Sequence, residues 1–234
     1  MRLLLTSLGL TNDSIRTALT ELMGKPISDA SLVFVPTAMH AVAEGGRYLW
    51  EDIASQTQVG WRSASLLELT ALRSIPERDW LPSVQEADVI MVDGGNTPYL
   101  SYWFETSGFA EKLPTLLERC VYVGVSAGSI IVSHSLVINA EKLELTGVYS
   151  DDQYGDEAPL NFGSNFTLQL VPVVVRPHLN ASYLQHVSLA DMEQACAHIE
   201  APVYAIDDQT ALKVVDGHIE VVSEGEWKLL ERRT

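Results

Sequence analysis

Basic residues are scarce in this sequence of 234 residues. It contains 15 Lys and Arg against 31 Asp and Glu, which gives a formal net charge of −16 at pH 7. Proteins bind nucleic acids and anionic membrane surfaces through Lys and Arg, so this deficit argues against both kinds of partner. We therefore expect no nucleic acid and no membrane among the partners of the chain.

Cysteine is scarce as well, and long hydrophobic runs are lacking. The two cysteines, Cys120 and Cys196, are too few for a disulfide framework or a cysteine-rich metal site, and both lie in apolar segments where a thiol is typically buried. No apolar stretch is long enough to span a bilayer, and the run after Met1 is too short for the core of a signal peptide. We expect a soluble, cytoplasmic protein.

Short apolar runs alternate with helix-like segments over the first half of the chain. The runs of strand length cover residues 3–5, 32–35, 63–69, 89–92 and 121–125. The helix-like segments between them cover residues 11–23, 41–57, 71–72 with 76–86, and 99–104 with 109–117. This order predicts a three-layer α/β fold, with a mostly parallel sheet and helices on both of its faces, in a single domain over residues 1–234.

The second half of the chain has a different pattern. Short strands are expected at residues 137–138 and 143–145, a long loop rich in Asp, Gly and Asn at 149–165, and a β-prone run that should join the same sheet at 168–175. A helix is expected over residues 182–199, followed by strands at 203–206, 211–215 and 219–222. Asp216-Gly217 between the last two strands predicts a β-hairpin, and residues 225–229 can add an edge strand.

The segment Gly124-Val125-Ser126-Ala127-Gly128 follows a buried-strand pattern and precedes a helix-compatible apolar run. A strand, a Gly-x-Ser-x-Gly turn and a helix together are typical of a nucleophile elbow, in which a strained turn exposes the serine hydroxyl at the end of the sheet. Ser126 is therefore the candidate nucleophile. The backbone N–H of Ala127 would point at the oxygen of the attacked carbonyl group.

A serine hydroxyl is a weak nucleophile until a base accepts its proton, and six histidines are available for this role. His178 is the preferred base because it follows the run 168–175, whose end should lie at the sheet edge where Ser126 emerges. His134 is close to Ser126 in sequence but is expected to point elsewhere. His40, which follows another strand, is the second choice as a pocket residue.

The base in turn needs an acidic partner that orients it. Asp207-Asp208 follows the strand 203–206, and Glu141 and the loop acids Asp151, Asp152 and Asp156 are alternatives. Gly94-Gly95, which follows the strand 89–92, offers unhindered backbone N–H groups that could complete an oxyanion hole with Ala127.

Three segments together resemble the peptidase E (α-aspartyl dipeptidase) family, which also includes cyanophycinases. They are Val92-Asp93-Gly94-Gly95-Asn96-Thr97, then Tyr122-Val123-Gly124-Val125-Ser126-Ala127-Gly128, then Arg176-Pro177-His178-Leu179-Asn180. The three occur in the order and spacing of the family, and the alternation of strands and helices is compatible with it over nearly the whole chain.

This resemblance implies a fold like that of class I glutamine amidotransferases, with a serine in place of the cysteine nucleophile. Ser126 would be the nucleophile and His178 the general base, with the oxyanion bound by Gly94 or Gly95 together with Ala127. Asp208 lies where peptidase E carries a glutamate, whereas Glu141 lies where another acidic candidate of the family falls. Asn96, Thr97 and Arg176 would contact the substrate.

The resemblance implies a serine-type peptidase that acts on short peptides through an acyl-enzyme, without a metal ion or an organic cofactor. Family members that cut after an amino-terminal aspartate carry an arginine-containing segment after the Pro-His motif, whereas residues 181–194 contain no Lys or Arg. The resemblance thus suggests Asp-Xaa dipeptides as substrates but does not secure specificity for aspartate. The alternatives are an amidase or esterase with a non-peptide substrate and a catalytically silent ligand-binding protein, and the chain is expected to be a monomer or a homodimer.

Overall fold

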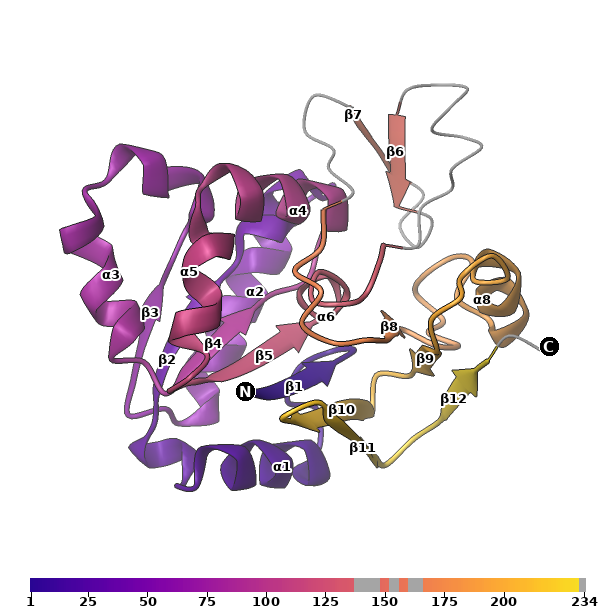
Figure 1. Ribbon diagram of the computed structural model, residues 1–234, viewed down its shortest axis with the longest axis horizontal. Coiled ribbons are helices and arrows are strands. Elements are labelled where there is room, and N and C mark those ends of the chain that lie inside the picture. Colours follow the sequence, from indigo (N-terminus) through magenta and orange to yellow (C-terminus); the bar gives the residue numbers. More distant parts are fainter. Residues whose placement is uncertain (137–147, 152–155, 160–165, 232–234) are drawn as a thin grey trace.

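The computed structural model describes residues 1–136, 148–151, 156–159 and 166–231. A seven-stranded sheet runs through its centre in the order β11-β10-β1-β5-β4-β2-β3 (Figure 1). The parallel strands are β1 (Arg2–Thr6), β5 (Val121–Val125), β4 (Val89–Val92), β2 (Ser31–Val35) and β3 (Ser63–Leu66). The antiparallel strands are β10 (Thr210–Val215) and, at the edge, β11 (His218–Ser223). The mostly parallel sheet and the C-terminal hairpin are thus confirmed.

Helices cover both faces of this sheet. One face carries α1 (Asp13–Met23) and α2 (Gly45–Val59), and the other carries α3 (Glu77–Gln85), α4 (Thr97–Thr106), α5 (Phe109–Leu116) and α6 (Ala127–Ile130). In β1, Leu4 packs on the side of α1 and α2, whereas Leu3 and Leu5 pack on the opposite side. Successive side chains of a strand point to opposite faces, so a strand covered on both faces must be apolar throughout.

A second, smaller sheet packs beside the first and positions part of the site. Its order is β12-β9-β8, with β8 (Val174–Arg176) parallel to β9 (Val203–Ile206) and β12 (Trp227–Leu230) antiparallel to β9. The edge strand expected near residues 225–229 is therefore present, but it belongs to this second sheet. Figure 1 shows β8 and β9 between the central sheet and α8 (Leu189–Ala195), with β12 on the outer side of β9 near the C-terminus.

The expectation of one long strand over residues 168–175 in the central sheet is wrong. The first part of this run bonds to the segment after α6 instead, because Leu168 N donates to Ile131 O at 2.8 Å and Leu170 N donates to Val132 O at 2.9 Å. The backbone groups that would pair with a neighbouring strand are thus used elsewhere. Only the last residues form β8, and that strand pairs in the second sheet.

The helix expected over residues 182–199 is much shorter than the sequence pattern indicates. It begins after Ser188, whose side chain accepts a hydrogen bond from Asp191 N while Asp191 accepts one from Ser188 N, a complete capping box. Because this box satisfies the free N–H groups of a first helical turn, the helix starts there and the preceding residues form turns.

The bounds of other elements also differ from those that the sequence predicts. Residues 37–41 form a 3₁₀ turn, η2 (Thr37–Ala41), and α2 begins only at Gly45, after Glu44 takes a left-handed φ of 57°. Two further 3₁₀ turns are η1 (Ile27–Asp29) and η3 (Leu69–Ser74). The loop expected at residues 149–165 is interrupted by two paired antiparallel strands, β6 (Val148–Asp151) and β7 (Asp156–Pro159). The strands expected at 137–138 and 143–145 lie outside the described residues.

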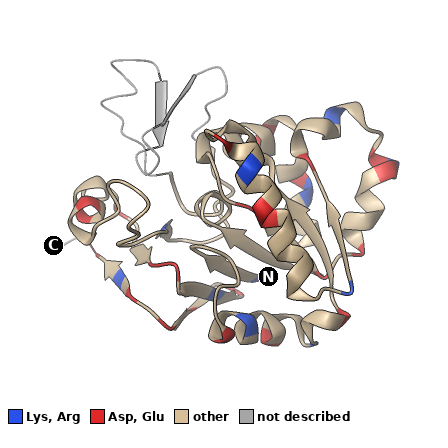
Figure 2. Cartoon of the chain, turned by 180° about the vertical axis from the view of Figure 1, so that it is seen from behind, with Lys and Arg blue, Asp and Glu red and all other residues tan. Residues whose placement is uncertain are grey.

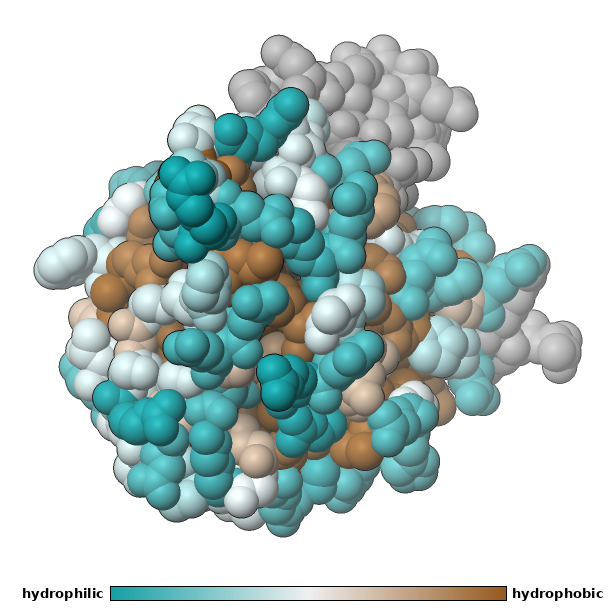
Figure 3. Space-filling view, turned by 60° about the vertical axis from the view of Figure 1, so that its left-hand side comes forward, coloured by the Kyte–Doolittle hydropathy of each residue, from teal (hydrophilic) through white to brown (hydrophobic). Residues whose placement is uncertain are grey.

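Polar side chains dominate the surface. Figure 3 shows one face on which hydrophobic residues appear between hydrophilic ones, and Figure 2 shows acidic residues spread over several helices and loops. Cys120 and Cys196 are both buried and free, as expected. Within the described part of the chain, no helix combines the length and the hydropathy that crossing a membrane requires.

Candidate active site

Ser126 lies between the end of β5 and the start of α6, in a strained turn. Its φ of 47° and ψ of −107° lie in a region that non-glycine residues rarely adopt. Glycines make this turn possible, because a Cβ on Gly124 would lie 2.7 Å from the Gly128 backbone and one on Gly128 would overlap Val92 O. The turn holds the Ser126 side chain at the carboxyl end of the central sheet, where it is 4% exposed.

Three residues from three strand ends form a continuous hydrogen-bonded chain. His178 Nε2 lies 2.8 Å from Ser126 Oγ, and His178 Nδ1 lies 2.8 Å from Asp208 Oδ1. His178 follows β8 and has a φ of 64°, while Asp208 follows β9. The structure thus brings Ser126, His178 and Asp208 together, although His178 reaches Ser126 from the second sheet and not from the central one.

The charge of Asp208 determines which nitrogen of His178 carries the proton. Burial raises the pKa of Asp208, but the hydrogen bond and charge of His178, with hydrogen bonds from Ser7 and Tyr183, outweigh burial and lower it overall. An ionised carboxylate can only accept hydrogen bonds, so Nδ1 of His178 carries the proton. Nε2 then has its lone pair free to accept the hydroxyl proton of Ser126.

Two residues that the sequence did not single out complete this environment. Ser7, directly after β1, donates to Asp208 Oδ1 at 2.6 Å and accepts from His178 N at 2.8 Å. Tyr183 donates its hydroxyl to Asp208 Oδ2 at 2.5 Å. Ser7 could have been found from its place at the carboxyl end of a parallel strand, where ligands bind in such sheets. Tyr183 gives no comparable signal, because the turn around it is not evident from its sequence.

The segments after β4 and β5 meet at Ser126. Gly94 packs against it so closely that a Cβ on Gly94 would lie 3.3 Å from Ser126 Cβ. Gly95 has a φ of 125°, and a Cβ there would lie 2.5 Å from Ala38 O. Within the described part of the chain, the N–H groups of Gly95 and Ala127 donate to no other group. Gly95 lines the cavity beside Ser126, whereas Ala127 is fully buried and is not among the residues that line it.

The other candidates of the sequence lie elsewhere. His40 Nε2 lies 2.8 Å from Glu68 Oε2, and Asp207 holds a turn through hydrogen bonds from Gln209 N and Thr210 Oγ1. Glu141 lies outside the described residues, so the structure does not place this alternative third member.

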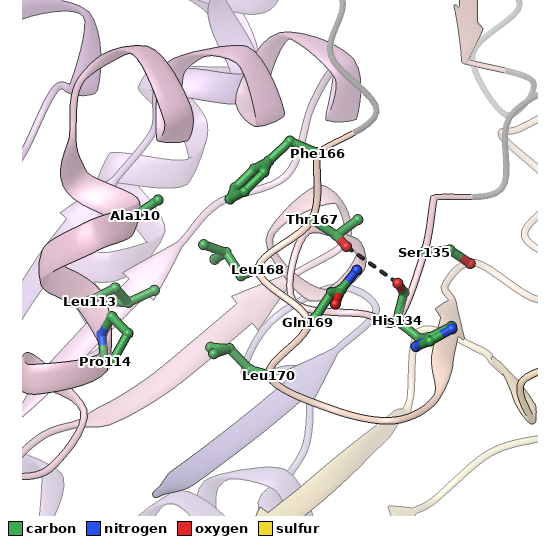
Figure 4. A pocket seen from close by; sticks show the side chains of 10 residues that line it. All are labelled: Ala110, Leu113, Pro114, His134, Ser135, Phe166, Thr167, Leu168, Gln169 and Leu170. Carbon is green, nitrogen blue, oxygen red and sulfur yellow. Dashed lines mark hydrogen bonds between the residues drawn. The ribbon is translucent and has the colours of Figure 1, made fainter.

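A cavity of about 450 Å³ lies between α5 and residues 166–170, and Ser126 is not among the residues that line it. His134 lines it, and its carbonyl oxygen accepts a hydrogen bond from Thr167 Oγ1 at 3.4 Å (Figure 4). His134 is therefore separated from the chain of Ser126, His178 and Asp208.

Asn96, Thr97 and Arg176, the residues expected to contact the substrate, are all buried. None of them lines the cavity of about 980 Å³ that adjoins Ser126. Asn96 caps α4, since its side chain accepts a hydrogen bond from Tyr99 N. Thr97 is the first residue of that helix. Arg176, the last residue of β8, is 3% exposed.

A cavity of about 980 Å³ opens beside Ser126 and His178. Its walls come from the segments after β1, β4 and β5, from α1 and α2, and from the turn that carries Tyr183. Two acids, Asp52 of α2 and Asp93 after β4, line it, and Arg16 of α1 is its basic residue. No group of three or more His, Cys, Asp or Glu among the described residues is arranged to hold a metal ion.

Comparisons with known proteins agree with this fold. The model of peptidase family S51 matches residues 3–222. The chain is similar to the structure of a candidate peptidase E protein from Listeria monocytogenes EGD-e, with a TM-score of 0.64 and 18% identity over 96% of this chain and 98% of that one. It is also similar to a peptidase from an acI-B1 actinobacterium, with a TM-score of 0.63 and 16% identity over 99% and 94%. No curated protein matches it in sequence.

Proposed function

This chain belongs to peptidase family S51 and is therefore a serine-type peptidase, and we propose that Ser126, His178 and Asp208 carry out its catalysis on short peptides. One observation supports these roles above all others. Ser126 Oγ, the His178 ring and Asp208 Oδ1 form an unbroken series with two contacts of 2.8 Å. The nucleophile thus lies within hydrogen-bonding distance of the base, and the base within hydrogen-bonding distance of the acid that orients it, as serine hydrolysis requires.

In the proposed reaction, Ser126 Oγ attacks the carbonyl carbon of the scissile bond while His178 Nε2 takes its proton. The C–N bond of the tetrahedral intermediate then breaks, and the same proton passes from His178 to the leaving amine. Water attacks the resulting ester, with His178 again as the base, and Ser126 is regenerated. Asp208 remains ionised throughout and stabilises the positive charge that forms on His178.

The oxyanion of each tetrahedral intermediate would be bound by the N–H groups of Ala127 and Gly95. Ala127 follows Ser126 directly and Gly95 lines the cavity that holds Ser126, and within the described residues neither N–H group donates to another group. Their preorganised dipoles act at a largely buried serine, where electrostatic stabilisation is stronger than in water.

The experiment compares the parent protein with Ser126→Ala and Asp208→Asn on a panel of dipeptides, including Asp-Xaa peptides. We expect Ser126→Ala to lose at least about 10³-fold in kcat, and Asp208→Asn to lose about 10³- to 10⁴-fold because the wrong tautomer of His178 is then favoured. A Gln209→Ala variant, next to Asp208 but outside the hydrogen-bonded series, serves as a neighbouring control. Retention of activity in Ser126→Ala would contradict the mechanism.

A further inference from the structure

Two carboxyl groups in the cavity beside Ser126 are hydrogen-bonded to each other and have no part in the proposed reaction. Asp93 directly follows β4 and precedes Gly94, and Asp52 lies at the middle of α2. Their side chains share a hydrogen bond, and both residues line the cavity. The contact therefore joins α2, which forms one wall of the cavity, to the segment that carries Gly95.

This hydrogen bond requires a proton on one of the two groups. An ionised carboxylate only accepts hydrogen bonds, so one aspartate must be a carboxylic acid that donates its O–H to the other. Asp93 is 5% exposed, and its buried Oδ2 has no N–H or hydroxyl donor among the described residues. Burial first, and then the charge of Asp52, raises the pKa of Asp93, and burial also raises the pKa of Asp52. Until this proton is lost, the pair carries one shared proton and one negative charge.

Neighbouring basic groups do not take the place of this proton. Arg16 of α1 is the basic residue of the cavity wall, and within the described residues it forms no ion pair with either aspartate. Glu51, which precedes Asp52, adds negative charge, and His40 after β2 is paired with Glu68. The other ionisable groups that line the cavity are Tyr48, His178 and Tyr183. Loss of the proton would therefore leave two negative charges in contact.

Few buried side chains hold α2 against the sheet. All residues of α2 are described, and Gly45 is the only one of them that is buried. Leu49, Ile53 and Val59 pack partly buried against the sheet. Because so little of the helix is buried, a hydrogen bond at its middle contributes appreciably to its position.

Asp93 connects this hydrogen bond to the proposed oxyanion hole. Its carboxyl group also accepts a hydrogen bond from the backbone of Gly94, whereas the N–H of Gly95 donates to no group among the described residues. Gly94 packs against Ser126, since a Cβ on Gly94 would lie 3.3 Å from Ser126 Cβ. A shift of Asp93 would therefore move the N–H of Gly95 relative to the nucleophile.

We propose that Asp52 and Asp93 are positioning residues, which share one proton and thereby hold the Gly94-Gly95 segment where its free N–H can bind the oxyanion. This rests on the peptidase mechanism proposed above. When the pH rises and the proton is lost, two like charges remain in contact at a largely buried site, where their repulsion is poorly screened. The segment and α2 then move apart, and the oxyanion loses a donor.

The first test is the pH dependence of kcat for the best dipeptide of the panel, from about pH 5 to pH 10. For the parent protein we expect kcat to fall at the alkaline end by at least about tenfold, since removal of one oxyanion donor costs about 10²–10³ in kcat. A profile without an alkaline fall would overturn the proposal while the peptidase mechanism stands.

Variants of Asp52 assign this fall to the carboxyl pair. Asp52→Asn supplies a permanent N–H donor to an ionised Asp93, so it should remove the alkaline fall. Asp52→Ala supplies no donor, so it should lower kcat at every pH. Glu51→Gln removes a charge from the same helix outside the cavity wall and should retain the alkaline fall. A fall with the parent midpoint in Asp52→Asn would contradict the role of the shared proton.

Infrared spectroscopy detects the shared proton without catalysis. In a Ser126→Ala background we expect the C=O stretching band of a protonated carboxyl group at about pH 6, where ordinary carboxyl groups are ionised. Asp93→Asn and Asp52→Asn should each remove this band, Glu51→Gln should retain it, and its midpoint should match that of the alkaline fall in kcat. Absence of the band from the Ser126→Ala protein would overturn the proposal even if peptides are hydrolysed, whereas failure of the proposed reaction would leave the band in place.

Discussion

Individual side chains in this site are held by groups that the sequence places far apart. Asp208 receives hydrogen bonds from Ser7, His178 and Tyr183, and these keep its pKa low although burial alone would raise it. Asp93 is in the opposite situation, since burial and a second carboxyl group raise its pKa. These two aspartates thus favour opposite protonation states, which follows from their surroundings and not from their residue type.

The pKa of Asp93 leads to a prediction about stability. A carboxyl group whose pKa is raised by folding stabilises the folded protein fully below the ordinary Asp value of about 3.9, and this contribution is lost as pH rises through the raised pKa. Asp93→Asn cannot ionise. We therefore expect its melting temperature, relative to that of the parent protein, to increase as the pH is raised from 4 to 8. A difference that stays constant or shrinks over this range would contradict the prediction.

The turn between β5 and α6 is the element that sets the position of the nucleophile. Its two glycines allow the backbone of Gly124 to approach Gly128, and Gly128 to approach β4. Close packing of this kind leaves no room for a methyl group and resists relaxation because both contacts are with backbone atoms.

We predict that Gly128→Ala lowers the free energy of unfolding by about 1–3 kcal/mol and also reduces activity, because its Cβ would overlap Val92 O and move the turn that carries Ser126. Thermal melting and dipeptide hydrolysis measure the two effects. Gly46→Ala provides the matched control, since Gly46 lies in α2 with open space at its Cβ position. That change should be neutral or stabilising by roughly 0.5–1 kcal/mol.

The net negative charge is a property of the whole molecule and affects its stability. The formal net charge of −16 means that charged groups repel one another in the compact state, and Figure 2 shows the acids distributed over the fold. Added salt shortens the screening length from about 30 Å at 0.01 M to about 8 Å at 0.15 M.

We therefore expect the melting temperature at pH 7 to rise by ~2–4 °C over this range of NaCl, which corresponds to about 1 kcal/mol for a chain of this size. The same series near the isoelectric point of about 4.6 serves as the control and should show a smaller rise, because less repulsion remains to be screened. An equal response at both pH values would indicate a general salt effect instead.

The sequence by itself determined the central sheet, its two helical layers and the nucleophile elbow. Strands such as 89–92 are apolar throughout because both faces are covered, and the elbow needs its glycines at fixed spacing. These are local requirements, so they are visible in the residues themselves.

Only the tertiary structure decided how His178 and Asp208 reach Ser126. The run 168–175 bonds mostly to the segment after α6, and its last residues pair with β9 in a second sheet, so no periodicity within the run could reveal its partner. Ser7 and Tyr183 meet at Asp208 from opposite halves of the chain. Pairing between distant segments depends on which backbone and polar groups remain unsatisfied after the core has packed, and a single sequence does not contain that information explicitly.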